Sequence, residues 1–209
     1  MKVDWKKTDK AYYRPKNEPE RIRVPAFKYF TISGAGDPNK EGFQEYVGAL
    51  YSLAYTIRMS PKSGTAPDGY YEYTVFPLEG VWDISEEAER NFGRLDKDSL
   101  VYTLMIRQPD FVLKDYARSV LELVKRKKPS PHLDEVRFET IEDGDCVQMT
   151  HIGPYDAEAA SFARMEAFCA ANALARVSRI HREIYMSDPR KANPATMKTV
   201  LRFQVRPAV

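Results

Sequence analysis

The chain has 209 residues, which is enough for one large domain or two small ones. Hydrophobic residues make up 43% and charged residues 30%, a balance typical of a packed core rather than of disorder. The formal net charge of +2 gives no electrostatic footprint for nucleic acid. The polar N-terminus has no signal-peptide core, and no apolar run of about 18 residues occurs, so we expect a soluble, cytoplasmic protein with no membrane segment.

Metal and cofactor chemistry is disfavoured by the spacing of the ligating residues. The two cysteines, Cys146 and Cys169, have no partner at metal-binding spacing, and the histidines at 132, 151 and 181 are scattered. The chain has no nucleophile elbow, no phosphate-binding glycine loop and no zinc-protease helix motif. The sequence therefore predicts no metal and no organic cofactor. Its 13 tyrosines, 10 phenylalanines and 2 tryptophans instead indicate a flat or apolar ligand.

The first half of the chain alternates strand and helix signals after a loosely docked N-terminal arm predicted over residues 1–20. Aromatic and β-branched runs predict strands, and apolar residues at three- and four-residue steps predict helices. A glycine-rich turn precedes the first helix. The predicted elements are strands 27–33, 70–76, 81–84 and 99–108, helices 40–58 and 109–127, and a turn at 86–90.

The second half follows the best candidate linker, Pro129-Ser130-Pro131. Its first two strands flank the polar run 142–145, which predicts a β-hairpin. A helix with Asp156 as its N-cap and two further strands complete the chain. The predicted elements are strands 136–141, 146–151, 180–187 and 197–206 and a helix over 157–176.

The order strand, glycine turn, helix, strand, strand occurs twice, with Gly36 and Gly153 in the two turns. We interpret this order as a duplication within a single domain, with repeats at about 20–128 and about 132–209. The predicted fold class is α+β. In it, the duplicated strand-helix-strand-strand unit forms one antiparallel sheet with helices on one face and a ligand cleft at the pseudo-twofold axis.

The strand predicted around 180–187 carries the most informative side chains. Because alternate residues of a strand share a face, His181, Glu183 and Tyr185 project together, whereas Arg182 and Ile184 project the other way. A carboxylate between an imidazole and a phenol indicates a function if this face of the sheet is covered. A solvated face with a cross-strand partner for Glu183 is the simpler alternative, and spacing alone favours it.

Seven segments of the chain, taken together, carry a family resemblance. The chain resembles the GyrI-like small-molecule-binding family over nearly its whole length. Relatives include ligand-binding domains of multidrug-responsive transcription activators, a gyrase-inhibiting protein, and stand-alone proteins, and the resemblance implies a ligand cleft between two halves. Some stand-alone members hydrolyse cyclopropane-bearing DNA-alkylating natural products with a pocket carboxylate and aromatic residues. The segments are 34–39, 46–55, 77–82, 106–111, 151–155, 181–189 and 198–202.

The resemblance also implies site residues. It places Glu183 at the family's pocket glutamate and Trp82, Tyr155 and Tyr185 at pocket aromatics, with His181 beside them. Core packing is the alternative role for Trp82 and Tyr155, and a structural hydrogen bond is the alternative for His181. About 26 residues precede the first predicted strand, too few for a helix-turn-helix module, which disfavours a transcription factor.

The residues leave functions from different classes open. As an anion, Glu183 would pair with a lipophilic cation stacked on aromatic rings, so that the protein binds or sequesters aromatic, often cationic, small molecules. As a general base, Glu183 would take a proton from water that attacks a strained carbon, and Tyr155 or Tyr185 would hold the water or donate to a carbonyl. A third class is an interaction module such as a topoisomerase inhibitor. Arg182 stands where many stand-alone relatives have a second histidine, which leaves the exact substrate open.

Overall fold

The computed structural model describes residues 2–84, 97–188 and 191–208, so the predicted turn at 86–90 lies outside the described residues. The chain forms a mixed α+β fold in two compact units, which are described one at a time. Unit 1 comprises Met1–Asp4 and Phe27–Ile141, and unit 2 comprises Trp5–Ala26 and Glu142–Val209. Among the described residues, every helix is too short or too polar to serve as a membrane span.

In unit 1 the central strand is β3 (Leu100–Gln108), which lies antiparallel between β1 (Glu20–Ala35) and β2 (Leu78–Ile84). Leu104 of β3 lies opposite Ile32 of β1 and opposite Gly80 of β2, which fixes both registers. The strand predictions at 27–33 and 99–108 are confirmed, and the strand predicted at 81–84 begins three residues earlier, at Leu78. Both β1 and β4 (Arg137–Ile152) continue from one unit into the other along the chain.

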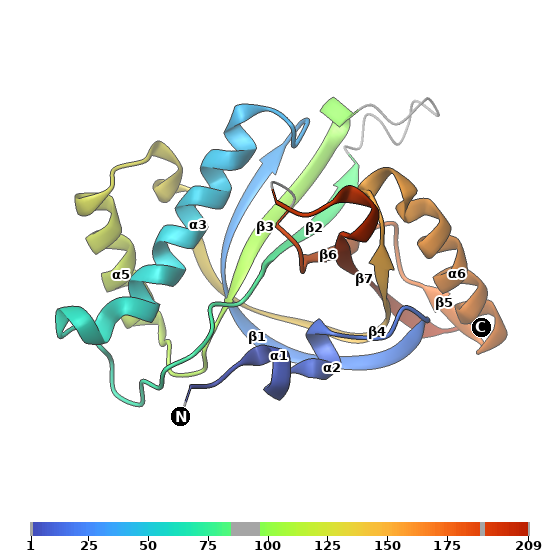
Figure 1. Ribbon diagram of the computed structural model, residues 1–209, viewed down its shortest axis with the longest axis horizontal. Coiled ribbons are helices and arrows are strands. Elements are labelled where there is room, and N and C mark those ends of the chain that lie inside the picture. The colour runs from blue at the N-terminus through green and yellow to red at the C-terminus, as the bar shows by residue number, and fades with distance from the viewer. Residues whose placement is uncertain (1, 85–96, 189–190, 209) are drawn as a thin grey trace. The chain divides into compact units, whose positions relative to one another are not determined.

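Helices α3 (Glu41–Met59) and α5 (Lys114–Lys127) contact each other, and α3 also contacts β3 (Figure 1). The apolar stripe of α3 is buried, as its periodicity predicts, with Leu50, Leu53 and Ile57 fully inaccessible to solvent. The predicted bounds of α3 are confirmed to within one residue. Helix α5 begins later than predicted, because the chain first makes a turn in which Val112 donates to the Pro109 carbonyl. Short 3-10 helices lie at Ser60–Ser63, Lys97–Ser99 and Pro131–Asp134.

The prediction of a strand at 70–76 is wrong. Within this segment only Tyr73 forms an isolated bridge, with Val3, and its ring is buried. The Tyr70 hydroxyl donates to the Arg58 carbonyl at 2.8 Å, and Tyr73 packs edge-on against Phe111. These aromatic side chains cover the end of α3 and the loop before α5 instead of lining a sheet, so aromatic content alone misled the strand prediction.

In unit 2 the central strand is β7 (Lys198–Pro207), which pairs antiparallel with β4 on one side. On the other side β7 pairs with β6 (His181–Tyr185) and, farther along, with β5 (Leu174–Arg176). Leu201 of β7 lies opposite Met149 of β4 and opposite Glu183 of β6. The predicted hairpin at 142–145 is wrong, because β4 runs through this segment as one strand with Gly144 at a positive φ of 67°.

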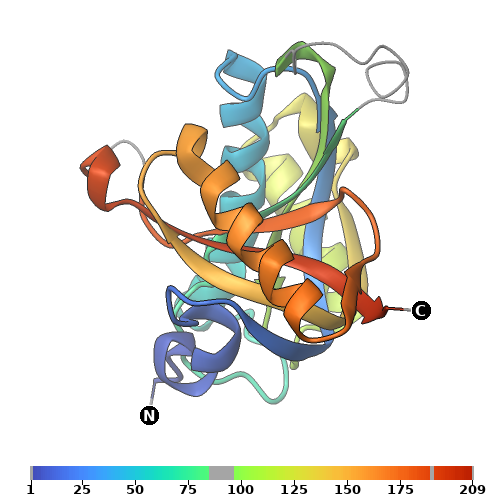
Figure 2. The ribbon, with the colours of Figure 1, turned by 90° about the vertical axis from the view of Figure 1, so that its right-hand side faces the viewer.

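One face of the unit 2 sheet is covered by α6 (Glu158–Ala171), which lies across the strands (Figure 2). Helix α6 ends five residues before its predicted end, because Ala173 adopts a positive φ of 52° and the chain turns into β5. Short 3-10 helices lie at Tyr155–Ala157 and Pro194–Thr196. The core between sheet and helix consists of Val147, Met149, Met165, Cys169, Leu174, Leu201, Phe203 and Val205, with Phe162 and Phe168 packed against it.

The N-terminal segment packs on the opposite face of the unit 2 sheet. It forms two single-turn helices, α1 (Trp5–Thr8) and α2 (Lys10–Tyr13). The side chains of Trp5 and Tyr13 are buried and their ring centroids lie 5.3 Å apart. This segment was predicted to dock loosely, and all helices were predicted on one face. The structure corrects both points, because the polar composition of residues 1–20 hid two buried aromatic anchors.

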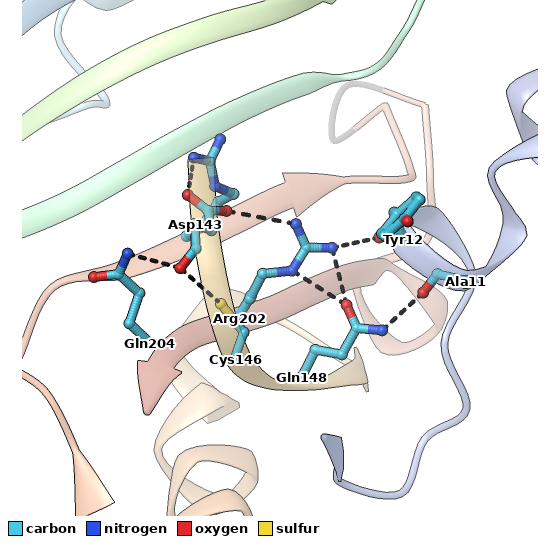
Figure 3. Close-up of polar contacts among 8 residues, drawn as sticks. Ala11, Tyr12, Asp143, Cys146, Gln148, Arg202 and Gln204 are labelled. Atoms are coloured by element: carbon cyan, nitrogen blue, oxygen red, sulfur yellow. Dashed lines mark hydrogen bonds and ion pairs between the residues drawn. The ribbon is translucent and has the colours of Figure 1, made fainter. Parts of the chain in front are cut away.

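Buried polar side chains join the N-terminal segment to this face (Figure 3). The Arg202 guanidinium donates to the Tyr12 carbonyl at 2.6 Å and to the Gln148 side-chain oxygen at 2.9 Å. The Gln148 amide then donates to the Ala11 carbonyl at 2.8 Å. Arg202 and Gln148 are almost completely buried, and these bonds replace the water that both side chains lose.

Asp143 of β4 lies at the other end of this polar cluster (Figure 3). Its carboxylate accepts a hydrogen bond from Arg182 of β6 at 2.7 Å and lies 3.7 Å from the Arg202 guanidinium of β7. The Asp143 carbonyl accepts from the Gln204 side-chain amide at 2.9 Å. One residue therefore links three strands of unit 2, which is the physical reason that the 142–145 segment stays in the strand.

Replacing Asp143 with Ala is expected to lower the free energy of unfolding by about 3–5 kcal/mol, because it removes the carboxylate from two buried guanidinium groups. Denaturant unfolding measures this loss. The matched control is Asp145→Ala on the same strand. Asp145 pairs with Arg21 at 3.3 Å at an exposed position, so its loss is expected to cost under ~1 kcal/mol. Equal losses for the two variants would contradict a special role for Asp143.

In unit 1, His132 lies between two carboxylates. Its Nδ1 lies 3.0 Å from Glu135 and its Nε2 lies 2.7 Å from Glu45 of α3, and the Tyr46 ring packs edge-on against the imidazole. Carboxylates only accept hydrogen bonds, so only the imidazolium form donates to both. The hydrogen bonds to Glu135 and then Glu45 raise the pKa of His132 above its ordinary value.

The raised pKa of His132 means that its contribution to stability is complete below the ordinary pKa of 6.5 and is lost as pH rises through the folded-state pKa. His132→Gln is expected to lower the free energy of unfolding by up to ~1 kcal/mol at pH 5.5 and by less at pH 9, since both carboxylates are largely exposed. Denaturant unfolding at the two pH values measures the difference. An equal loss at both would contradict the charged bridge.

Candidate functional site

Glu183 lies on the face of unit 2 that α6 covers. It is directly opposite Leu201, which belongs to the core beneath α6, and opposite residues of antiparallel strands share a face. The Glu183 side chain is only 12% exposed. The neighbours Arg182 and Ile184 are buried on the other face, as the two-residue period predicts. The simpler alternative of a solvated face is therefore wrong for Glu183.

His181 is fixed beside Glu183. Its Nε2 lies 3.2 Å from a Glu183 carboxylate oxygen, and its Nδ1 lies 3.4 Å from the Arg179 carbonyl. The Phe162 ring of α6 packs edge-on against the imidazole at 4.8 Å between centroids. Because a carboxylate only accepts, the Nε2 atom carries the proton of this bond. His181 thus orients Glu183 from within the same strand.

Tyr155 and Tyr185 border the same carboxylate. Their rings meet edge to face with centroids 6.0 Å apart. The Tyr155 side chain is partly exposed, so one part of it is available to a ligand. Burial, followed by the nearby charges of Glu183, Glu158 and Asp188, raises the pKa of Tyr155 to about 12. Its phenol therefore keeps its proton at neutral pH and is a hydrogen-bond donor.

Glu158, the first residue of α6, is an acidic residue near this site that no sequence pattern singled out. Its side chain is buried. Burial, then the charge of Glu183, the hydrogen bond to Glu183 and the charge of Asp156 raise the pKa of Glu158 from 4.5 to about 9. Burial at the start of α6 therefore favours the protonated form of Glu158.

Little in the sequence pointed to Glu158. An acidic residue in the first turn of a helix is ordinary, because it complements the positive end of the helix dipole. Glu158 and Glu183 are also far apart in sequence, and only the packing of the α6 N-terminus against β6 brings their carboxyl groups together. From the sequence alone, a buried carboxylate at position 158 could therefore not be distinguished from a solvated one.

Trp82 belongs to unit 1. It is buried, with its ring stacked on Phe43 at 6.1 Å and tilted against Tyr102 at 5.0 Å between centroids. These contacts are those of a core residue of unit 1. The role of Trp82 as a ligand contact stays a prediction.

Matched registers show what occupies the Glu183 position in unit 1. In unit 1, Leu104 of the central strand β3 is paired with a residue of each neighbouring strand. In unit 2, Leu201 of the central strand β7 is paired in the same way. Gly80 is opposite Leu104, and Glu183 is opposite Leu201. Unit 1 thus has a glycine where unit 2 has the central carboxylate.

His151 is buried near the start of α6, and both of its ring nitrogens have partners. Nδ1 lies 2.8 Å from the Ser161 hydroxyl, and Nε2 lies 3.1 Å from the Pro154 carbonyl. These bonds are consistent with a histidine that donates to a carbonyl and accepts from a hydroxyl, which is a structural role. Within the described ranges, no group of three or more His, Cys, Asp and Glu side chains has a geometry that could hold a metal ion.

The chain belongs to the GyrI-like family, because the model of the GyrI-like small molecule binding domain matches residues 17–206. A small-molecule-binding function follows from this membership. A crystal structure of a hydrolase from Listeria innocua is 42% identical, covers 99% of this chain and 100% of its own, and has a TM-score of 0.90. A second hydrolase structure from Listeria innocua is 40% identical, with coverages of 98% and 100% and a TM-score of 0.87.

A more distant similarity concerns the fold alone. The C-terminal domain of EcmrR is 13% identical, with coverages of 91% of this chain and 98% of that domain and a TM-score of 0.51. No curated protein matches the chain.

Proposed function

We propose that the protein is a hydrolase that binds an aromatic small molecule at the Glu183 site and adds water to it. The observation that carries this proposal is the largely buried Glu183 carboxylate, which lies beside the His181 Nε2 atom and is bordered by the rings of Tyr155 and Tyr185. A carboxylate placed beside proton donors is suited to acid–base chemistry on a bound molecule. The relatives from Listeria innocua that are described as hydrolases support the same reaction class.

The proposed substrate class is a cyclopropane-bearing alkylating compound with a conjugated carbonyl. Glu183 takes a proton from water while the water oxygen bonds to a cyclopropane carbon. The strained carbon–carbon bond breaks, and its electron pair moves through the conjugated system to the carbonyl oxygen. That oxygen takes a proton from solvent water, and Glu183 returns its own proton to solvent, so the net change is the addition of one water. The Tyr155 phenol donates a hydrogen bond to that oxygen as its negative charge develops. The product is the ring-opened compound with one water added.

A second candidate is the binding and sequestration of aromatic cations without chemistry. The observation that favours it is the largely buried carboxylate of Glu183 beside the Tyr155–Tyr185 ring pair. A cation held there gains both charge pairing and contact with aromatic faces. In this candidate, as in the first, His181 and Tyr185 are proposed ligand contacts beside Glu183.

Glu183→Gln is expected to lower turnover of a cyclopropane-bearing alkylator by about 10²–10⁴-fold, because glutamine cannot accept the proton of water. The change is nearly isosteric, so the melting temperature should stay within a few degrees. Single-turnover mass spectrometry follows the reaction, and the gain of one water on the released compound identifies hydrolysis. Full turnover by the folded variant would exclude Glu183 as the base. A wild-type protein that binds the compound and leaves its mass unchanged would favour sequestration.

Tyr155→Phe is expected to lower turnover by about 10²-fold, the usual effect of removing one donor to a developing oxyanion. The substrate dissociation constant should change by less than ~3-fold, because the ring that contacts the ligand remains. Single-turnover rates and equilibrium binding separate the two effects. An unchanged rate constant together with weaker binding would show that Tyr155 only packs against the ligand.

A further inference from the structure

Arg176 lies on the same face of unit 2 as Glu183. It is the last residue of β5 and is directly opposite Val205 of β7, which belongs to the core beneath α6. The central carbon of its guanidinium lies 4.5 Å from the ring centroid of Phe203 and 5.4 Å from that of Phe162. Its Nε atom has no hydrogen-bond partner within the described ranges, so the two rings and the terminal nitrogens hold the guanidinium in place.

The two terminal nitrogens of Arg176 have different partners. One donates to the Glu166 carboxylate of α6 at 3.1 Å, and the other donates to the Arg179 carbonyl at 2.6 Å. The ion pair with Glu166 contributes little, because that glutamate is 56% exposed to solvent. The bond to the carbonyl is the shorter of the two, and short hydrogen bonds from charged donors are among the stronger kinds. Only this second contact leads towards the Glu183 site.

The Arg179 carbonyl also faces the imidazole of His181. The Nδ1 atom of His181 lies 3.4 Å from the carbonyl oxygen, which is longer than an ordinary N–H to oxygen hydrogen bond of about 2.9 Å. The Nε2 atom on the other side of the ring lies 3.2 Å from the Glu183 carboxylate. The Phe162 ring packs against both the imidazole and the guanidinium of Arg176. One backbone carbonyl, one shared ring and one imidazole thus join Arg176 to Glu183.

We propose that Arg176 is a positioning residue, which keeps the His181 proton on Nε2 and so keeps the Glu183 carboxylate aimed at the ligand. Arg176 and the Nδ1 atom of His181 approach the same carbonyl oxygen, so the charge of Arg176 disfavours a proton on Nδ1. The proton then stays on Nε2, where it is donated to Glu183. This inference deepens the proposed function and rests on it for the role of Glu183. It assigns Arg176 no contact with the ligand or with the reacting atoms.

The first test needs no ligand. Nitrogen-15 NMR of the imidazole rings reports which ring nitrogen carries a proton, and the spectrum of His181→Gln identifies the His181 signals. At about pH 8, where imidazoles are ordinarily neutral, the wild type should show the His181 proton on Nε2 alone. Arg176→Met should show a larger share of that proton on Nδ1, because methionine packs against the same rings but cannot donate to the carbonyl.

Two outcomes of this measurement would overturn the proposal. One is a wild-type His181 ring with a proton on Nδ1, alone or together with Nε2, and this outcome does not require Arg176→Met to fold. The other is an identical ring state in the wild type and in folded Arg176→Met. Either result would show that Arg176 does not decide where the ring proton resides.

The functional test compares Arg176→Met with Arg176→Lys in turnover of a cyclopropane-bearing alkylator with a conjugated carbonyl. The kcat of Arg176→Met should fall by about 10-fold or more, because small displacements of a reacting group are costly. Lysine still offers a charged N–H to the Arg179 carbonyl, so Arg176→Lys should recover kcat to within ~3-fold of the wild type. The KM should stay within ~3-fold in both variants, since the residues that contact the ligand are unchanged.

The matched control is Glu166→Gln, which removes the other polar partner of Arg176 and should leave kcat within ~2-fold of the wild type. A loss in this control as large as that in Arg176→Met would overturn the role of the carbonyl contact. Equal kcat values in the two Arg176 variants, with turnover still lost in Glu183→Gln, would overturn the positioning role alone. Full turnover in Glu183→Gln would instead overturn the proposed function.

Discussion

The ion pair between Asp143 and Arg182 is the interaction on which the arrangement of unit 2 depends. It joins β4 to β6 at 2.7 Å beneath the N-terminal segment, and Arg202 of β7 lies beside it. Side chains alternate along a strand, so placing Arg182 on this face places Glu183 on the face covered by α6. A shift of β6 by one residue would exchange the two, burying a carboxylate away from its partners. The polar cluster on one face thus fixes the site on the other.

The α6 face joins an apolar core to an acidic site. Met149, Met165 and Leu201 fill the space between sheet and helix, and at the helix N-terminus this space ends at Glu158 and Glu183. Removing water from two ionised carboxylates costs more free energy than removing it from one carboxylate and one neutral carboxylic acid. The burial that brings the helix start against the sheet also raises the pKa of Glu158, so the same packing affects both the geometry and the ionisation of this region.

The two units share a strand order but differ in chemistry. In each, the first strand pairs with the last, the last also pairs with the strand just before it, and a helix follows the first strand. Unit 1 has Gly80 and a buried Trp82 where unit 2 has Glu183 and the partly exposed Tyr185. The two units thus share a strand order but have different side chains at these matched positions.

Periodicity in the sequence determined the parts of the structure that depend on local pattern. The apolar stripe of α3, the central strands β3 and β7 and the common face of His181, Glu183 and Tyr185 all follow from it. The packed N-terminal segment, the continuous β4 and the loop at 70–76 did not follow, because side chains distant in sequence hold each of them. Glu158 shows the reason most clearly. Its place at a helix start was visible in the sequence, but its raised pKa depends first on burial and then on the charge of a carboxylate 25 residues away, and both depend on tertiary packing.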